Sequence, residues 1–412
     1  KVTSNMFKSF VNINEIRLSR NKIAELCENA FYGLVELKSL DLSFNQLRTI
    51  QLDTLFNNLE CLEMLSLEAN RLDHVSEMLF GKLKKLTTLN LKCNLIDKLS
   101  KMIRFKAKSD ALVAFGRLKH LNVANNFICS LDDIELAKTF PSLIQLDLKA
   151  NRIGALSRKH LIGMSNLTVL DVSHNRIEAC DDALLLKDCA KSIQYVHLNH
   201  NKLKSIDKNL FNNLSQLIFL NLANNQLDHL DCLFMGCKNL QEINLSSNKL
   251  SSKTTDFALL FGQVKNLISL DLSSNHFERL DKHAIDSLTS IEKLYVRQNK
   301  LSFIHPALFA RTTMLTYLDF SNNLIQSLDE NVFSSLSNLE VLDLRSNLLS
   351  NVKFIRNLKS LSTLYLQENK IDTLEATFMN TLDNIERVHL SKNRLTFISK
   401  LMFQTNFISQ LK

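Results

Sequence analysis

Asparagine returns at a nearly constant interval along this chain, each time as the last residue of the frame L-x-x-L-x-L-x-x-N. Most intervals are 22 to 27 residues, and one is 32. A fixed period of this size indicates a solenoid, in which each repeat forms one coil and packs on its neighbours. The series predicts 16 repeats, ending at Asn21, Asn45, Asn70, Asn94, Asn126, Asn151, Asn175, Asn201, Asn225, Asn248, Asn275, Asn299, Asn323, Asn347, Asn369 and Asn393.

Within each frame the x-x-L-x-L stretch alternates between leucine and other residues, as in Leu40-Asp41-Leu42. Alternation of this kind predicts a short strand with the leucines buried and the x residues exposed. Strands from successive repeats would form a parallel sheet with a spacing of about 4.8 Å. We expect the asparagine at the following turn to bind backbone groups of neighbouring repeats.

The second half of each repeat predicts the other side of the coil. A short polar residue that can cap a helical turn follows many asparagines by about six positions, at Ser76, Asp207, Asp231, Asp281, Asp329 and Ser399. An aromatic residue follows about four positions later, and we expect these rings to stack inside the coil: Phe31, Phe80, Phe211, Phe309, Phe333 and Phe403.

Composition bounds the function of the 412 residues. The chain is 45% hydrophobic, which can fill a long core, and its net charge of +8 is a mild excess compatible with anionic partners. No run of 18 apolar residues predicts a membrane span, and the first residues do not match a signal-peptide pattern, so we expect any such segment to lie outside this sequence. With only 7 scattered glycines and no nucleophile elbow, phosphate-binding loop or clustered metal ligands, we expect no enzyme, no cofactor and no metal site.

The ends of the chain are out of phase with the repeat. Residues 1–10 fit the second half of a truncated repeat, residues 11–407 hold the sixteen repeats, and residues 408–412 fit the start of another. Solenoid ends require polar caps. We therefore expect a single solenoid domain that belongs to a longer protein.

The frame resembles the leucine-rich repeat family, and Leu37 to Leu47 and Leu267 to Asn275 match its pattern closely. The 24-residue length with a late phenylalanine is similar to the subclass found in Toll and Toll-like receptor ectodomains, adhesion molecules and matrix proteoglycans. The resemblance implies a right-handed α/β-repeat horseshoe, with a concave parallel sheet and convex loops and short helical turns. It implies binding of macromolecules, but it transfers no ligand residues, because those occupy the variable x positions.

Tyrosine concentrates at the exposed strand positions of the C-terminal repeats. Tyrosine is a favoured interface anchor because it combines a large area with a polar tip. We therefore predict a concave ligand-binding patch of Tyr295, Tyr317, Tyr365, Lys293, Arg297, Arg345, Arg387 and His389, and a weaker one of Tyr195, His197 and Phe219. The alternative is that tyrosine simply suits half-exposed strands. An outward row of aspartates (Asp41, Asp147, Asp171, Asp271, Asp319 and Asp343) is typical of the family's L-D-L-S sequence.

The 32-residue interval predicts an insertion at about residues 97–117. It is basic, with Lys101, Arg104, Lys106 and Lys108. A basic protruding loop could bind a polyanion such as a glycosaminoglycan. The alternative is a solvated loop without a partner.

The cysteines leave two alternatives open. Cys189 and Cys237 replace a closing leucine of the repeat and fit buried thiols. Cys180 and Cys189 share one repeat, as do Cys232 and Cys237, so local disulfides are also compatible with the sequence.

Three N-x-S/T sequons occur, at Asn166, Asn213 and Asn244. Each uses a leucine of the frame, so chance matches are expected. A glycan at Asn244 would block the middle of the exposed sheet face.

These patterns favour an extracellular or cell-surface ligand-recognition solenoid of a receptor, such as an innate-immune Toll-like receptor. Its partner would be a protein ligand or co-receptor, with homo- or heterodimerisation compatible, and membrane contact only through segments absent from this chain. The alternatives are a secreted or cell-surface adhesion or matrix protein that binds proteins or glycosaminoglycan, and an intracellular scaffold.

Overall fold

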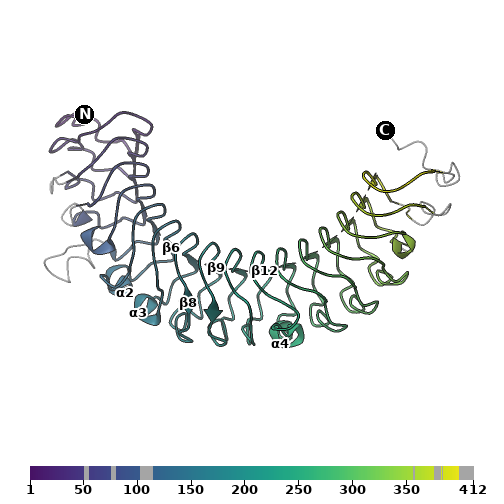
Figure 1. Ribbon diagram of the computed structural model, residues 1–412. Helices are drawn as coiled ribbons and strands as arrows, with labels where there is room; N and C mark the ends of the chain where they lie inside the picture. The colour runs from purple at the N-terminus through teal and green to yellow at the C-terminus, as the bar shows by residue number, and fades with distance from the viewer. Residues whose placement is uncertain are drawn as a thin grey trace. The chain divides into compact units, whose positions relative to one another are not determined.

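The computed structural model describes residues 1–50, 55–75, 80–102, 115–355, 358–374, 382 and 384–398. The chain divides into two compact units, Lys1–Leu203 and Lys204–Lys412. Each unit is a solenoid built on a parallel sheet, as the repeat predicts (Figure 1). The prediction of sixteen repeats in a single domain stays a prediction.

Unit 1 carries one three-residue strand per coil, and successive strands pair in parallel with no offset, for example Leu40 opposite Leu65. The strands are β1 Glu15–Arg17, β2 Ser39–Asp41, β3 Met64–Ser66, β4 Thr88–Asn90, β5 His120–Asn122, β6 Gln145–Asp147, β7 Val169–Asp171 and β9 Tyr195–His197. Its other elements are η2 Leu99–Met102, α2 Leu136–Thr139, α3 Arg158–Leu161 and β8 Ala179–Cys180. The helices α2 and α3 lie on the side of the coil away from the strands (Figure 1).

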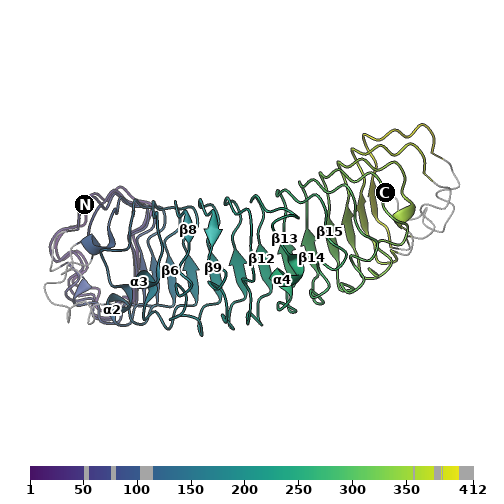
Figure 2. The ribbon, with the colours of Figure 1, turned by 60° about the horizontal axis from the view of Figure 1, so that its bottom comes forward.

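Unit 2 repeats the plan, and its strands stand side by side in Figure 2. They are β11 Phe219–Asn221, β12 Glu242–Asn244, β13 Ser269–Asp271, β14 Lys293–Tyr295, β15 Tyr317–Asp319, β16 Val341–Asp343, β17 Thr363–Tyr365 and β18 Arg387–His389. Its other elements are β10 Ser205–Ile206, α4 Phe257–Phe261 and η3 Lys353–Ile355.

The core follows the leucine pattern. The central residue of a strand is buried and its two neighbours face outward, as for Leu40 between Ser39 and Asp41. Leu294, Leu318 and Leu342 are all 0% exposed. At roughly 2 kcal/mol for each buried leucine side chain, this repeated column is the main favourable contribution to folding.

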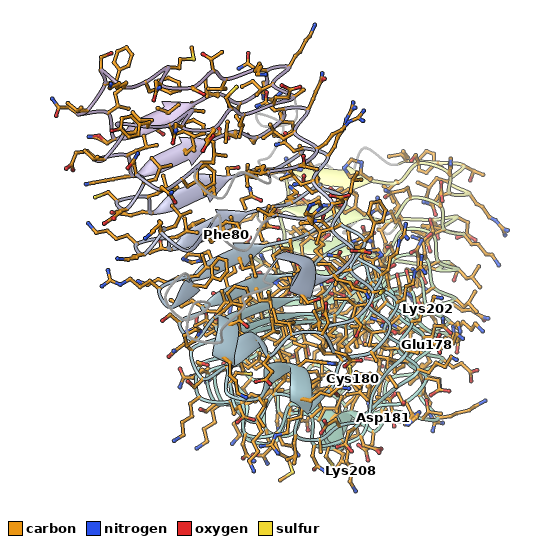
Figure 3. All side chains as sticks on the ribbon, turned by 90° about the vertical axis from the view of Figure 1, so that its left-hand side faces the viewer. Phe80, Glu178, Cys180, Asp181, Lys202 and Lys208 are labelled. Atoms are coloured by element: carbon orange, nitrogen blue, oxygen red, sulfur yellow. The ribbon has the colours of Figure 1, made fainter. Side chains whose placement is uncertain are left out.

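Phenylalanine rings form the predicted stacks inside each unit. The Phe31 and Phe56 ring centroids are 6.0 Å apart, and those of Phe309 and Phe333 are 5.7 Å apart. Phe80, labelled in Figure 3, is fully buried and lies 5.1 Å from Phe115. Phe403 lies outside the described residues.

The predicted capping residues begin turns more often than helices. The Oδ1 atoms of Asp207 and Asp329 accept hydrogen bonds of 2.8 Å from the backbone N–H groups of Asn209 and Asn331. The segments that follow are turns, because each ends after a few residues to enter the next strand. Ser76 and Ser399 lie outside the described residues.

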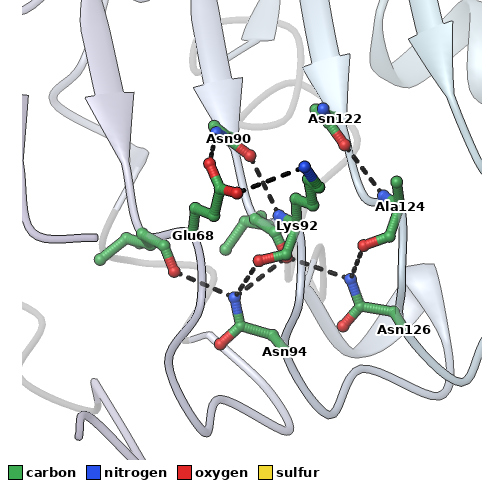
Figure 4. Close-up of polar contacts among 9 residues, drawn as sticks. Glu68, Asn90, Lys92, Asn94, Asn122, Ala124 and Asn126 are labelled. Atoms are coloured by element: carbon green, nitrogen blue, oxygen red, sulfur yellow. Dashed lines mark hydrogen bonds and ion pairs between the residues drawn. The ribbon is translucent and has the colours of Figure 1, made fainter. Parts of the chain in front are cut away.

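The recurring asparagines bind the backbone as expected (Figure 4). The Nδ2 of Asn94 donates to the carbonyl oxygens of Leu67 at 3.0 Å and Leu91 at 3.0 Å, and its Oδ1 accepts from the Leu72 N–H at 3.0 Å. One side chain thus joins two coils. Asn126 makes the same set of bonds one coil later. We call this series the asparagine ladder.

The residue before each ladder asparagine has a left-handed backbone, with φ between 52° and 59° at these positions in all sixteen frames. None of these sixteen residues is glycine; they include Phe44, Ala69, Ala150 and Glu368. Residues with a Cβ pay about 1 kcal/mol or more for this conformation. The strain persists because the carbonyl and amide groups on either side are fixed by the ladder.

Replacing a ladder asparagine should destabilise the protein strongly. Asn275 is 4% exposed and joins the Leu250 N–H to the carbonyls of Leu245, Leu272 and Ser273. Asn275→Ala leaves these groups unpaired, so we expect the free energy of unfolding in urea to fall by about 2–4 kcal/mol. Exposed Lys300→Ala is the control, and an equal effect of both substitutions would contradict a structural role for the ladder.

Relieving the left-handed strain should stabilise the protein. Ala150 has φ 53°, so we expect Ala150→Gly to raise the free energy of unfolding by up to about 1 kcal/mol. Ala223, 4% exposed and with an ordinary backbone, is the matched control, and Ala223→Gly should lower stability by about 1 kcal/mol. Thermal and urea unfolding measure both, and a loss of stability in Ala150→Gly would show that the conformation carries no strain.

Candidate functional site

The exposed face of the unit 2 sheet is the candidate site. Parallel pairing without offset aligns equivalent residues of successive strands in rows. Row 1 holds the first residue of every strand and row 3 holds the third, and both face outward. Row 5 holds the residue two positions after the last residue of each strand. Row 1 contains Phe219, Glu242, Ser269, Lys293, Tyr317, Val341, Thr363 and Arg387. Row 3 contains Asn221, Asn244, Asp271, Tyr295, Asp319, Asp343, Tyr365 and His389.

Row 5 continues this alignment beyond the strands. The backbone N–H of Ser274 donates to the Arg297 carbonyl at 2.8 Å, and that of Asn322 donates to the Arg345 carbonyl at 2.9 Å. The row contains Ala223, Ser246, Ser273, Arg297, Ser321, Arg345, Gln367 and Ser391. Every residue predicted for the C-terminal patch therefore lies on these three adjacent rows.

The structure brings the aromatic residues of the patch into contact in two groups. The Tyr295 and Tyr317 ring centroids are 5.1 Å apart. Tyr365 stacks on His389 with centroids 4.7 Å apart, and the Arg345 guanidinium lies over the Tyr365 ring at 5.6 Å. All three tyrosines are only half-buried. We call this cluster of Tyr295, Tyr317, Tyr365, Arg345 and His389 the tyrosine patch.

Positive charge borders the tyrosine patch. Lys293, Arg297 and Arg387 are exposed. The Nε of Arg387 donates to Thr363 Oγ1 at 3.2 Å, which fixes its side chain along row 1. Planar cations next to aromatic faces suit recognition of anionic and polar groups.

Two acidic side chains lie beneath this cluster. Asp319 and Asp343 face each other in row 3, and they are 3% and 1% exposed. Arg345 Nη2 contacts Asp343 Oδ2 at 3.0 Å. Burial, together with the neighbouring Asp319 carboxylate, raises the pKa of Asp343 to about 6. Burial and the same carboxylates raise the pKa of Tyr317 to about 12, so its phenol stays protonated.

Aspartate in row 3 also has a backbone role. Asp319 Oδ1 accepts from the Ser321 N–H at 2.9 Å, and Asp343 Oδ1 accepts from the Arg345 N–H at 3.1 Å. Where row 3 holds asparagine the same bond forms, as from Ser246 to Asn244 at 2.9 Å. The bond requires an acceptor oxygen but not a charge, so the acidic row is explained by the turn it closes.

The other predicted residues are placed as follows. Tyr195 and His197 are the outward residues of β9 in unit 1, whereas Phe219 begins β11 in unit 2, and this second patch stays a prediction. Arg104, Lys106 and Lys108 lie outside the described residues, and of Lys101 only the backbone, in η2, is described.

The sequons differ in exposure. Asn166 is exposed and its Nδ2 donates to the Pro141 carbonyl at 3.3 Å. Asn213 is exposed, with φ 64°. Asn244 lies in row 3, as predicted, with its Oδ1 engaged by Ser246.

The eight cysteines are free thiols. The structure therefore has the buried-thiol alternative, and the two local disulfides are absent. Cys189 Sγ donates to the Leu186 carbonyl at 3.4 Å and Cys237 Sγ to the Phe211 carbonyl at 2.9 Å. Burial raises the pKa of the Cys180, Cys189 and Cys237 thiols to about 12, so they pack as small hydrophobic groups. Cys180 is labelled in Figure 3.

Unit 1 has two features that sequence reasoning missed. The His174 and His200 imidazoles stack with centroids 4.0 Å apart, and burial together with His200 lowers the pKa of His174. A cavity of about 390 Å³ is lined by Glu60, Cys61, Lys84, Lys85 and Arg117. The sequence does place His174 and His200 at equivalent positions of successive frames. Only the structure shows that their side chains meet.

Comparison with known proteins agrees with the repeat. The family model described as leucine rich repeat matches residues 11–72, 60–104, 116–177, 191–250, 257–301 and 290–349, and a two-copy model of the same repeats matches residues 337–376. The chain belongs to the leucine-rich repeat family. The predicted parallel-sheet solenoid and the resemblance to Toll-like ectodomains are both confirmed.

Two curated relatives and one solved structure illustrate the range of the similarity. Osteomodulin of Bos taurus is 30% identical over 301 residues, covering 70% of this chain and 60% of that protein. Toll-like receptor 9 of Canis lupus familiaris is 30% identical over 220 residues, covering 48% of this chain and 21% of the receptor. The Toll–Spatzle complex of Drosophila matches with a TM-score of 0.68 at 20% identity, covering 92% of this chain and 48% of that one. The chain thus spans less than two thirds of each of these proteins.

Among the described residues, no helix has both the length and the apolar character needed to cross a membrane. In the same part of the chain, no group of three or more histidine, cysteine, aspartate or glutamate side chains is arranged to hold a metal ion.

Neutralising Asp343 should change how stability depends on pH. Because the folded pKa of about 6 lies above the ordinary value of 3.8, the native state favours the protonated acid. This contribution is fully present below about pH 4 and is lost as the pH rises through 6. Asp343→Asn keeps the acceptor for the Arg345 N–H, so we expect it to be more stable than the original protein at pH 7.5 by about 1–3 kcal/mol and equal to it at pH 4.

Urea unfolding at both pH values measures the effect. Asp271→Asn, at the same row position, is the matched control. A constant difference between Asp343→Asn and the original protein at the two pH values would contradict the raised pKa.

Proposed function

We propose that this chain is the ligand-recognition solenoid of an extracellular or cell-surface receptor, and that it binds a protein ligand through the tyrosine patch. The observation that carries the proposal is the concentration of half-exposed rings and cations on one face of unit 2. Tyr295 contacts Tyr317, Tyr365 contacts His389 and Arg345 lies over Tyr365, all on outward strand rows. Tyrosine and arginine dominate the binding energy of many protein interfaces.

The position of the rings supports binding over a purely structural role. Sheet stability needs the central leucines, which are buried whether or not tyrosine occupies the flanking rows. Valine or threonine serves equally in row 1 elsewhere on this sheet, at Val341 and Thr363. The rings form a rigid amphipathic surface that loses little side-chain entropy when a partner covers it.

The relatives support an extracellular location and an innate-immune or adhesive role. Toll-like receptor 9 and osteomodulin share the repeat with this chain, and the Toll structure is a complex with Spatzle. The sequons, two of them on exposed asparagines, are compatible with a secretory route and a glycoprotein. An adhesion or matrix protein remains the second candidate, favoured by the cationic cavity at Lys84, Lys85 and Arg117, which suits a sulfated glycosaminoglycan.

The tyrosine patch is tested by removing its rings. The chain, as a tagged soluble protein, is screened against an array of secreted proteins and cell-surface ectodomains, and the affinity of each hit is measured by surface plasmon resonance. We expect Tyr295→Ala, Tyr317→Ala and Tyr365→Ala together to weaken a hit at least tenfold, because truncating several anchors removes more than about 2 kcal/mol.

The control is Met64→Ala, Thr88→Ala and Gln145→Ala, all on row 1 of unit 1. The circular dichroism spectrum must be unchanged in both variants. If a protein ligand binds both variants with the original affinity, the tyrosine patch is not its binding site. Binding of heparin alone, lost on Lys84→Ala and Lys85→Ala, would favour the second candidate.

A further inference from the structure

Row 5 of unit 2 contains an unusual set of buried polar atoms without partners. Ser273 Oγ, Ser321 Oγ and Gln367 Oε1 are buried and, among the described residues, lack any hydrogen-bond partner. These three alternate along the row with Arg297 and Arg345. Leaving a buried polar atom unpaired is costly, so each of these atoms gains a hydrogen bond if a polar group of a ligand reaches it.

Two arginine side chains place positive charge beside these unpaired atoms. Arg297 is exposed and forms no ion pair among the residues that the structure describes. Arg345 is half-buried, and its contacts with Asp343 and the Tyr365 ring fix its direction. A serine hydroxyl can donate to an oxyanion, and Arg297 lies between the two serines. Because Arg297 is exposed and forms no ion pair among the described residues, its side chain can turn toward a ligand without breaking a salt bridge.

We propose that Ser273, Arg297, Ser321, Arg345 and Gln367 form an anion-binding strip that takes the carboxylates of an extended acidic segment of a protein ligand. The inference rests on the proposed function and specifies the chemistry of its partner. Each arginine can bind a carboxylate through two parallel N–H donors. The neighbouring serines would add hydroxyl donors to the same oxygens.

The spacing of the strip specifies the ligand further. Arg297 and Arg345 are two strands apart, which corresponds to about 9.6 Å at the usual strand spacing of about 4.8 Å. In a polyproline II segment, residues three apart lie on the same face and about 9.3 Å apart. In a fully extended strand, same-face residues lie about 6.7 or 13 Å apart. Two acids with two residues between them, in a polyproline II conformation, fit the arginine pair best.

The adjacent rows favour a protein over a polyanion. Row 3 next to the strip holds the acidic Asp271, Asp319 and Asp343. A nucleic acid or sulfated polysaccharide carries a charge on nearly every unit and would place some of them against this row. A peptide can place its acids on row 5 and apolar residues against the Tyr295, Tyr317 and Tyr365 rings. Aromatic-lined grooves are a common docking surface for proline-rich segments.

The test uses labelled peptides and the full chain. The probes are two capped peptides of one composition, Pro-Glu-Pro-Pro-Glu-Pro with acids three apart and Pro-Glu-Pro-Glu-Pro-Pro with acids two apart, and a glutamine analogue of the first. Fluorescence anisotropy at low salt should show at least threefold tighter binding of the first peptide than of the second. The glutamine analogue should bind at least tenfold more weakly.

Matched variants assign the binding to the strip. The double variant Arg297→Gln with Arg345→Gln should bind the first peptide at least tenfold more weakly than the original protein does. Lys265→Gln with Lys300→Gln removes the same charge from exposed positions of unit 2 outside the three rows, and should weaken it less than twofold. Ser273→Ala with Ser321→Ala should weaken it about threefold or more, which a purely electrostatic effect would not produce.

Several results would overturn the strip. These are undetectable binding of the first peptide, equal binding of the two spacings, equal losses in the arginine and lysine variants, and tighter arginine-dependent binding of a 12-nucleotide polyuridine RNA. A protein ligand from the ectodomain array whose binding requires the three tyrosines but not the two arginines would contradict the anion-binding strip and would leave the proposed function in place.

Discussion

The buried asparagine amide is the interaction on which the rest of the structure depends. At each turn the chain leaves a short strand and must satisfy backbone groups that no neighbouring strand pairs. One amide supplies both a donor and an acceptor, and it does so across two coils, as Asn94 does between the Leu67 carbonyl and the Leu72 N–H. Because a buried unpaired backbone group costs about 1–3 kcal/mol, the ladder fixes where each strand ends. The rows on the exposed face follow from that regularity.

Periodicity made the scaffold readable from the sequence. Leucine spacing predicted which residues are buried, the asparagine series predicted the turn, and the late phenylalanines predicted the stacks, because each feature repeats and depends only on its nearest neighbours. The left-handed residue before each asparagine was not predicted. This residue is phenylalanine, alanine, histidine, serine or another type in different coils. Its residue type therefore does not predict the left-handed conformation, which is fixed by the hydrogen bonds of the neighbouring asparagine ladder.

The binding face was predictable in outline only. The frame placed Tyr295, Tyr317 and Tyr365 outward, and the structure agrees. It could not show that Tyr365 stacks on His389 while Tyr295 meets Tyr317, since those choices depend on rotamers. Nor could it show that Asp343 is nearly fully buried, or that the hydroxyls of Ser273 and Ser321 lack partners. These are properties of packing between rows, and a period along the chain carries no information about them.

The hydrogen bond at row 3 has a consequence for how such a surface changes over time. Aspartate and asparagine close this turn with the same geometry, as at Asp319 and Asn244. Exchange between aspartate and asparagine therefore changes the charge at a row 3 position while it keeps the hydrogen bond that closes the turn. Selection can therefore change the charge pattern of this row one coil at a time while every turn keeps its closing hydrogen bond.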